Sequence, residues 1–245
     1  EYRISPGKQT VIEEFGYRDK QDYVQNQLED STELMQIVLA DSVHSLLKTG
    51  KPLDMDLLQS ERERVTRMLR EKGYFNFSKN FIQFYADTIQ GQEVDKAHLL
   101  LSVIGNPADS SAYRKFRIGE ININFDYDPL YLASGADSSY VDTTYGGYGI
   151  IYRDKLKIKP KLIEETIQFK EGELYNVQNV VDSYSRLQAL NLFKFINIVF
   201  KEKVDTTGVK SLVCDVQLIP MKRQSYNVFL EGTHNSGNIG VGGNL

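Results

Sequence analysis

The chain has 245 residues, of which 41% are hydrophobic and 25% charged, and its formal net charge is −4. This composition is ordinary for a globular protein with one or two cores, and it excludes a largely disordered chain. The negative charge gives no broad electrostatic reason to bind nucleic acid or an anionic membrane, although it leaves room for a local basic patch. No apolar run approaches the roughly 20 residues that a membrane-spanning helix needs.

In chain order, the first predicted elements are a strand, two helices and two strands. The apolar pattern predicts a strand at 11–17, a short helix at 39–47, and a longer helix that begins after an N-cap at Asp54. Strands at 75–85 and 97–104 complete this set.

The helix after Asp54 is predicted to be amphipathic. Its apolar stripe consists of Met55, Leu58, Val65, Met68 and Leu69. The charged residues that fall mostly outside this stripe, and are predicted to lie on the exposed face, are Glu61, Glu63, Arg64, Arg67 and Glu71. Such exposed charges stabilise a helix only slightly, by about 0.2–0.5 kcal/mol for a pair four residues apart.

The same order of elements is predicted again further along the chain. A strand at 118–125 contains a one-residue slip that indicates a β-bulge. A helix follows at 161–169, and a second helix begins after an N-cap at Asn176. Strands at 195–200 and 212–219 end this second set.

The single cysteine, Cys214, lies in the last of these strands. It cannot form an internal disulfide, and its apolar neighbours favour a buried small side chain over a reactive thiol. Because a protein without disulfides is compatible with an oxidising space, the cysteine leaves the compartment open.

Two segments show the repeat directly, at 69–77 (Leu-Arg-Glu-Lys-Gly-Tyr-Phe-Asn-Phe) and at 187–195 (Leu-Gln-Ala-Leu-Asn-Leu-Phe-Lys-Phe). Each closes a helix, turns at Gly73 or Asn191, and opens a segment with aromatic residues at alternate positions. An internal repeat of this size indicates a duplicated structural module. The module has the order β-α-α-β-β.

This order, the leucine-rich helix end and Gly73-Tyr74-Phe75 resemble the POTRA (polypeptide-transport-associated) domain. The tail at 220–240 resembles the junction where such proteins pass from their last POTRA domain into the first strand of an outer-membrane β-barrel. The whole chain is similar to the periplasmic part of BamA/TamA-type assembly proteins, most closely the Bacteroidetes forms, in which the segments 61–64 and 87–88 have close counterparts.

The resemblance implies an α+β fold with tandem POTRA modules, each a three-stranded mixed sheet with two helices on one face. The predicted modules span 8–106 and 112–221. Residues 1–7 are predicted to end a preceding module or linker, and 222–245 to form a linker and the start of the first barrel strand. Because the chain begins with Glu1 and not with methionine, we expect a segment of a longer protein.

The resemblance also implies a function. In the family, the strand after Gly-Tyr-Phe lies at the sheet edge and accepts an extended segment of another chain by β-augmentation, in which backbone hydrogen bonds give affinity. The candidate edge residues are Asn76, Phe77, Ser78, Phe81, Ile82, Phe84, Phe195, Ile196 and Ile198. Alternatively, these aromatics fill the core of their own module.

Implied partners are unfolded outer-membrane protein clients and periplasmic or envelope proteins, with no nucleic acid. The implied location is the periplasmic face of the outer membrane of a Gram-negative bacterium, with a C-terminal barrel as the anchor.

The second copy carries an insertion at 127–153 that the first lacks, and it is predicted to be a long loop. Its tyrosines either contact a partner or, as we favour, fix the loop to the module: Tyr131, Tyr140, Tyr145 and Tyr148. Its aspartates suggest calcium because hard cations take oxygen ligands, but their spacing lacks an EF-hand pattern, and no metal site is predicted: Asp126, Asp128, Asp137 and Asp142.

Motifs for catalysis are lacking in the sequence. His44, His98 and His234 have no metal-ligand spacing, and no nucleophile elbow or phosphate-binding loop is found. We therefore predict a protein that is not an enzyme and binds no cofactor. Two alternatives stay open, namely a peptide-binding repeat unconnected to a barrel, and a hydrolase with an unrecognised carboxylate pair.

Overall fold

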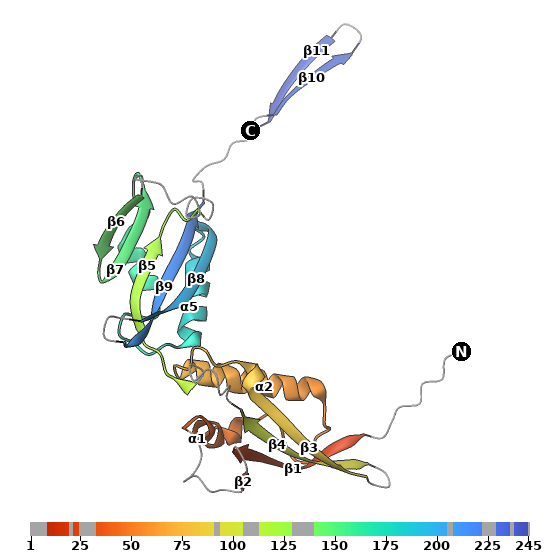
Figure 1. The fold of residues 1–245 in the computed structure, drawn as a ribbon. Coiled ribbons are helices and arrows are strands. Elements are labelled where there is room, and N and C mark those ends of the chain that lie inside the picture. Colours follow the sequence, from red (N-terminus) through yellow and green to blue (C-terminus); the bar gives the residue numbers. More distant parts are fainter. Residues whose placement is uncertain are drawn as a thin grey trace.

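The computed structural model describes residues 9–19, 22–24, 33–90, 94–104, 113–128, 140–204, 208–221, 229–235 and 238–244. Two α+β modules follow one another along the chain, and a two-stranded hairpin lies beyond the second (Figure 1). The predicted end of a preceding module, at 1–7, lies outside the described residues.

The sheet of the first module has the strand order β2-β1-β4-β3. Its strands are β1 (Thr10–Asp19), β2 (Asp22–Val24), β3 (Ile82–Ile89) and β4 (Asp95–Val103). β1 and β4 are parallel, whereas β3 is antiparallel to β4. The helical elements between β2 and β3 are α1 (Glu33–Ala40), the 3-10 turn η1 (Ser42–His44), α2 (Met55–Glu71) and the 3-10 turn η2 (Lys79–Phe81).

The second module repeats this plan. Its sheet has the order β6-β7-β5-β9-β8. Its strands are β5 (Ile118–Asn124), β6 (Tyr140–Tyr145), β7 (Tyr148–Arg153), β8 (Phe193–Val204) and β9 (Lys210–Pro220), and its helices are α4 (Pro160–Thr166) and α5 (Val177–Ala189). β5 is parallel to β9, and β8 is antiparallel to β9. The arrangement β5-β9-β8 therefore matches β1-β4-β3.

The α+β class and the tandem β-α-α-β-β order are confirmed. Both sheets also extend beyond the three predicted strands, on the outer side of the first strand of the module. β2 adds to β1, and β7 pairs in parallel with β5. The insertion is therefore not simply a long loop, because its second half forms the antiparallel hairpin β6–β7, which widens the sheet.

The local signals around the two long helices are confirmed. Asp54 accepts a hydrogen bond from the Asp56 amide, and Asn176 accepts from two amides in the first turn of α5. After the helices, Gly73 and Asn191 both adopt left-handed backbone conformations, with φ of 100° and 51°. The predicted bulge is present as a register shift between Ile118 and Ile121.

The first short helix was placed too late by the sequence. It was predicted at 39–47, but α1 spans Glu33–Ala40, and the chain then turns through η1. Leu34, Met35 and Val38 on α1 are all buried and pack into the first core, and Leu47, after the helix, is buried against Ile12 and Leu99.

Each module has its helices on one face of its sheet. In the first core, side chains of α1 and α2, including Leu69, pack against buried side chains of the strands, among them Ile82 and Leu101. In the second core, Leu187 of α5 packs with β5 and β9, including Cys214 and Val216. Cys214 is buried as predicted, and burial raises the pKa of its thiol well above the ordinary value.

Glu61 contradicts the prediction that the charges of α2 are solvated, because its side chain is fully buried. Its carboxylate accepts two hydrogen bonds from Arg64, at 2.8 and 3.0 Å, and a third from the Leu46 amide at 2.9 Å. Arg64 also donates to Asp41, just after α1. This network, Glu61–Arg64–Asp41, ties the η1 turn to α2.

The network makes part of the stability of the first module depend on pH. Burial alone would raise the pKa of Asp41, but hydrogen bonds from Arg64 and His44 outweigh it, so the pKa lies below its ordinary value. The ionised form therefore favours folding. This contribution is complete above the unfolded pKa of about 3.9 and is lost as the pH falls through the folded value.

We expect Asp41→Asn to be less stable than the native chain at pH 7, with the difference shrinking as the pH falls toward about 2. Urea unfolding of both proteins across this range measures the difference directly, because the other carboxylates contribute equally to both. A difference that stays constant with pH contradicts the assignment.

Beyond the second module, β10 (Phe229–Asn235) and β11 (Asn238–Asn244) pair in an antiparallel hairpin. This places two strands within the predicted tail. Among the described residues, no helix is both long and apolar enough to cross a membrane.

Candidate functional site

The strands that follow the repeated helix–turn segments lie at sheet edges. β3 ends the order of the first sheet and β8 ends that of the second. Each pairs with one strand only, β3 with β4 and β8 with β9, within the part of the chain that the structure describes. Their outer sides therefore present backbone N–H and C=O groups that no described strand takes up.

β3 is anchored at one end and projects at the other. Ile82 is buried, and Phe84 is partly buried with the Arg62 guanidinium 5.4 Å from its ring centre. From Tyr85 to Ile89 every side chain is exposed, including 39% of Tyr85 and 48% of Ile89. The outer end of β3, residues 86–89, is called the free edge.

The predicted strand at 75–85 begins too early, since β3 starts only at Ile82. Asn76, Phe77, Ser78 and Phe81 therefore precede the strand. Phe77 is 2% exposed and packs into the first core against Phe81, with ring centres 5.7 Å apart. Ser78 caps η2, accepting from the Asn80 amide at 3.4 Å. Phe77 and Phe81 therefore pack into the first core, and the η2 turn capped by Ser78 places the start of β3 at Ile82.

β8 offers a less open edge. Ile196 and Ile198 are partly buried against the second core, whereas Phe195 is 40% exposed and stacks on Tyr127 at 6.1 Å. Near the C-terminal end of β8, Glu202 accepts a hydrogen bond from Asn76 of the first module at 2.6 Å. We therefore take β3 as the stronger candidate.

Phe75 has a role that the sequence did not reveal. It packs with the second module, in a joint cluster formed by Phe75, Phe116, Tyr175 and Phe200. Its ring centre lies 5.0 Å from Tyr175 and 6.1 Å from Phe116, both in edge-to-face geometry that is favourable for aromatic pairs. The sequence signal for this contact is Gly73 followed by two aromatic residues, of which Tyr74 is buried in the first core and Phe75 packs in the joint cluster.

Polar contacts surround this cluster. The Phe116 amide donates to the Gly73 carbonyl oxygen at 3.0 Å, and Arg70 donates to the Tyr175 hydroxyl at 3.3 Å. A Cβ atom on Gly73 would lie 2.8–3.0 Å from the Leu174 side chain, so the close approach of the modules requires glycine there. Figure 1 shows α2 lying against the second module, and α2 and α5 are in contact. The two modules thus share one packed joint.

The tyrosines of the insertion have different surroundings. Tyr148 is buried in the second core. The Tyr140 hydroxyl donates to the Asp126 carbonyl oxygen at 3.0 Å and accepts from Arg153 at 3.0 Å. Tyr145 is 40% exposed at the end of the hairpin, and Tyr131 lies outside the described residues.

The described aspartates of the insertion do not form a metal site. The Asp126 carboxylate accepts from the Arg153 amide at 3.1 Å, and Asp142 is exposed on β6. Asp137 lies outside the described residues. Among the residues that the structure describes, no group of three or more histidine, cysteine or acidic side chains could hold a metal ion.

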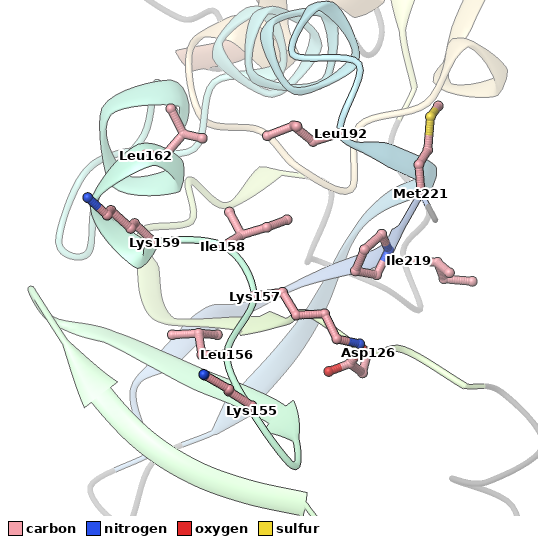
Figure 2. Close-up of a pocket in the computed structure, with 11 residues that line it drawn as sticks. Asp126, Lys155, Leu156, Lys157, Ile158, Lys159, Leu162, Leu192, Ile219 and Met221 are labelled. Carbon is pink, nitrogen blue, oxygen red and sulfur yellow. The ribbon is translucent and has the colours of Figure 1, made fainter. Parts of the chain in front are cut away.

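A hollow of about 1070 Å³ lies at the end of the second module where β9 ends (Figure 2). Lysines alternate with aliphatic residues along one side of it, in the segment Lys155-Leu-Lys-Ile-Lys159. The alternation of lysine and aliphatic residues is visible in the sequence, but no site was predicted there.

In strand order and helix placement, both modules follow the plan that the resemblance to POTRA domains implies. No model of a known protein family matches the chain, and no curated protein matches its sequence.

Solved structures match this chain at low sequence identity and with TM-scores below 0.5. BamA from Haemophilus ducreyi lacking POTRA domains 1–3 is 12% identical with a TM-score of 0.47, covering 91% of this chain and 32% of that one. POTRA3–5 of Haemophilus influenzae BamA is 10% identical with a TM-score of 0.31, covering 88% and 100%. POTRA1–2 of Omp85 from Anabaena is 13% identical with a TM-score of 0.35, covering 88% and 98%. The chain thus spans about a third of the length of the Haemophilus ducreyi protein.

Proposed function

We propose that the chain is a periplasmic pair of POTRA-like domains of an outer-membrane protein of the BamA/TamA type, and that it captures extended segments of client proteins at the free edge of β3. The observation that carries this proposal is the outer half of β3, exposed on both faces while its inner half is fixed in the core. In this role the chain is a non-catalytic scaffold for insertion or translocation of outer-membrane proteins.

Backbone capture suits clients of many sequences. An added strand forms hydrogen bonds to main-chain groups, so affinity depends little on its side chains. The exposed Tyr85 and Ile89 supply apolar contacts beside these bonds, and the antiparallel pairing with β4 holds the inner side of β3 in the sheet. Unfolded membrane proteins carry alternating segments that satisfy both demands.

A non-catalytic role agrees with how the acidic groups are used. Glu13 pairs with Lys96 at 2.5 Å, Glu120 with Lys203 at 2.7 Å, and Asp215 with Lys201 at 2.9 Å. These are exposed pairs on the sheet surfaces, and such pairs contribute little to stability.

The test uses two neighbouring proline variants, Asp87→Pro and Thr88→Pro. Successive residues of a strand direct their N–H groups to opposite sides, so one variant removes an outward donor and the other removes a donor paired with β4. We expect the outward variant to bind a short peptide of alternating apolar and polar residues about tenfold more weakly, with unchanged melting temperature. Fluorescence anisotropy and thermal unfolding measure the two quantities.

The peptide itself provides the control. Methylation of alternate amides removes the hydrogen-bond donors along one edge of the peptide while its side chains stay the same, and this should weaken binding by about tenfold or more. Equal binding by the methylated peptide, or by both proline variants and the native chain, would show that β3 does not capture strands.

A further inference from the structure

We propose that the end of the second module beside the hollow is a contact surface for anionic phospholipids of a bilayer. Its lysine strip is defined as Lys155, Lys157, Lys159 and Lys161. This inference rests on the proposed function, because in an outer-membrane protein of that type the tail predicted at 222–245 would lead from this end of the module into the membrane.

The charge of this segment differs from that of the chain. Residues 153–162 contain five cationic side chains and one acidic one, within a chain whose net charge is −4. Lys157 lies 3.6 Å from Asp126 and Lys161 lies 3.8 Å from Glu165, and these lysine side chains are 64% and 69% exposed. Pairs so long and so exposed are weak, so the strip keeps a positive potential.

The backbone divides the segment into two faces. Leu156 and Ile158 are partly buried against the second core, whereas the lysines that alternate with them, Lys155, Lys157 and Lys159, are exposed. Figure 2 shows Lys155 and Lys159 pointing to one side, while Lys157 extends toward Asp126. Packing of Leu156 and Ile158 therefore fixes the backbone from which the lysine side chains extend.

Aliphatic residues complete the surface. The remaining lining residues of the hollow are Leu162, Leu192, Ile219, Pro220 and Met221 (Figure 2). Leu192 is 38% exposed and Met221 is 48% exposed. Lysines bordering exposed aliphatic side chains are typical of surfaces that lie at a lipid interface, where the charges meet phosphates and the apolar groups enter the acyl boundary.

The lining favours lipid over a peptide. Apart from the lysines and Asp126, no side chain lining the hollow donates or accepts a hydrogen bond. A peptide lying there would place backbone amides against an aliphatic wall without partners, which is costly. A phospholipid has an anionic group for the lysines and an apolar part for the wall, so it leaves no such group unpaired.

Position supports the same partner. Pro220 and Met221 line the hollow at the end of β9, and the next described element along the chain is the β10–β11 hairpin. The surface thus lies where the chain leaves the second module toward its C-terminal strands, which the sequence predicts to begin a barrel.

The experiment is flotation of the 245-residue chain with vesicles of phosphatidylcholine, with and without phosphatidylglycerol. We expect binding only to the anionic vesicles, falling with added salt. Changing Lys155, Lys157 and Lys159 together to glutamine should lower the partition coefficient at least about tenfold. The matched control changes three exposed lysines elsewhere, Lys51, Lys72 and Lys170, and should bind as the native chain does.

Equal binding to neutral and anionic vesicles, or equal losses in the two triple variants, overturns the proposal. So does binding of an acidic peptide at this strip without binding to vesicles. The peptide assay at β3 separates the two proposals. If the lysine variant still binds peptide and the native chain ignores vesicles, only the lipid surface fails; if vesicles bind and β3 captures nothing, only the proposed function fails.

Discussion

Replacing Glu61 by alanine should destabilise the first module by about 3–5 kcal/mol, the usual result of removing one partner from a buried ion pair. Arg64 would lose two hydrogen bonds, and the Leu46 amide would lose its acceptor. The η1 turn would then be held to α2 mainly through Asp41. Urea unfolding at neutral pH measures the loss.

Glu63→Ala provides the matched control on the same helix. Glu63 is exposed and contacts Gln59 and Lys79 at the surface, so its loss should cost less than about 1 kcal/mol. If the two variants are equally stable, Glu61 does not act as a buried partner, and the account of the Glu61–Arg64–Asp41 network is wrong.

Replacing Phe75 by alanine should release the two modules from one another while each stays folded. The side chain lies in the joint cluster and not in the core of its own module. We expect the coupling between modules to fall by about 2–4 kcal/mol, because a large aromatic and its edge-to-face contacts are removed. Double electron–electron resonance between spin labels on α2 and α5 should show a narrow distance distribution becoming broad.

Phe77→Ala is the control two residues away. Phe77 is buried in the first core, so its loss should lower the stability of that module by about 3–5 kcal/mol. While the chain is folded, the distance distribution between the labels should stay narrow. A broad distribution in this variant, or a narrow one in Phe75→Ala, would assign the joint to other contacts.

The sequence predicted what depends on near neighbours. The caps at Asp54 and Asn176 and the left-handed turns at Gly73 and Asn191 are settled within a few residues, as is the bulge after Ile118. The repeat of these signals was enough to establish the order β-α-α-β-β and to place β3 and β8 after the turns.

What escaped prediction depends on distant partners. Glu61 can be buried because Arg64 balances its charge and the Leu46 amide donates a hydrogen bond to it. Phe75 packs outside the core of its own module because Tyr175 and Phe116 of the second module contact its ring. No periodicity within α2 or the turn reveals such partners.

The β6–β7 hairpin is a different case. Its two glycines, Gly146 and Gly147, both have positive φ, and they lie between alternating segments, which is a recognised hairpin signal. The hairpin could therefore be predicted from the sequence, and the prediction of one long loop was wrong. Likewise, alternating lysines mark the strip at 155–161, although only the fold shows that aliphatic residues border it.

Phe75 lies between α2 and β3, so the joint and the free edge belong to one short stretch of chain. In the proposed function, the residues that would hold a captured strand are therefore close in sequence to the aromatic residue that couples the two modules. Between them lies Phe77, which is anchored in the first core, while Phe75 contacts Tyr175 and Phe200 of the second module. A single change in length between α2 and β3 would thus alter the place of binding and the joint together.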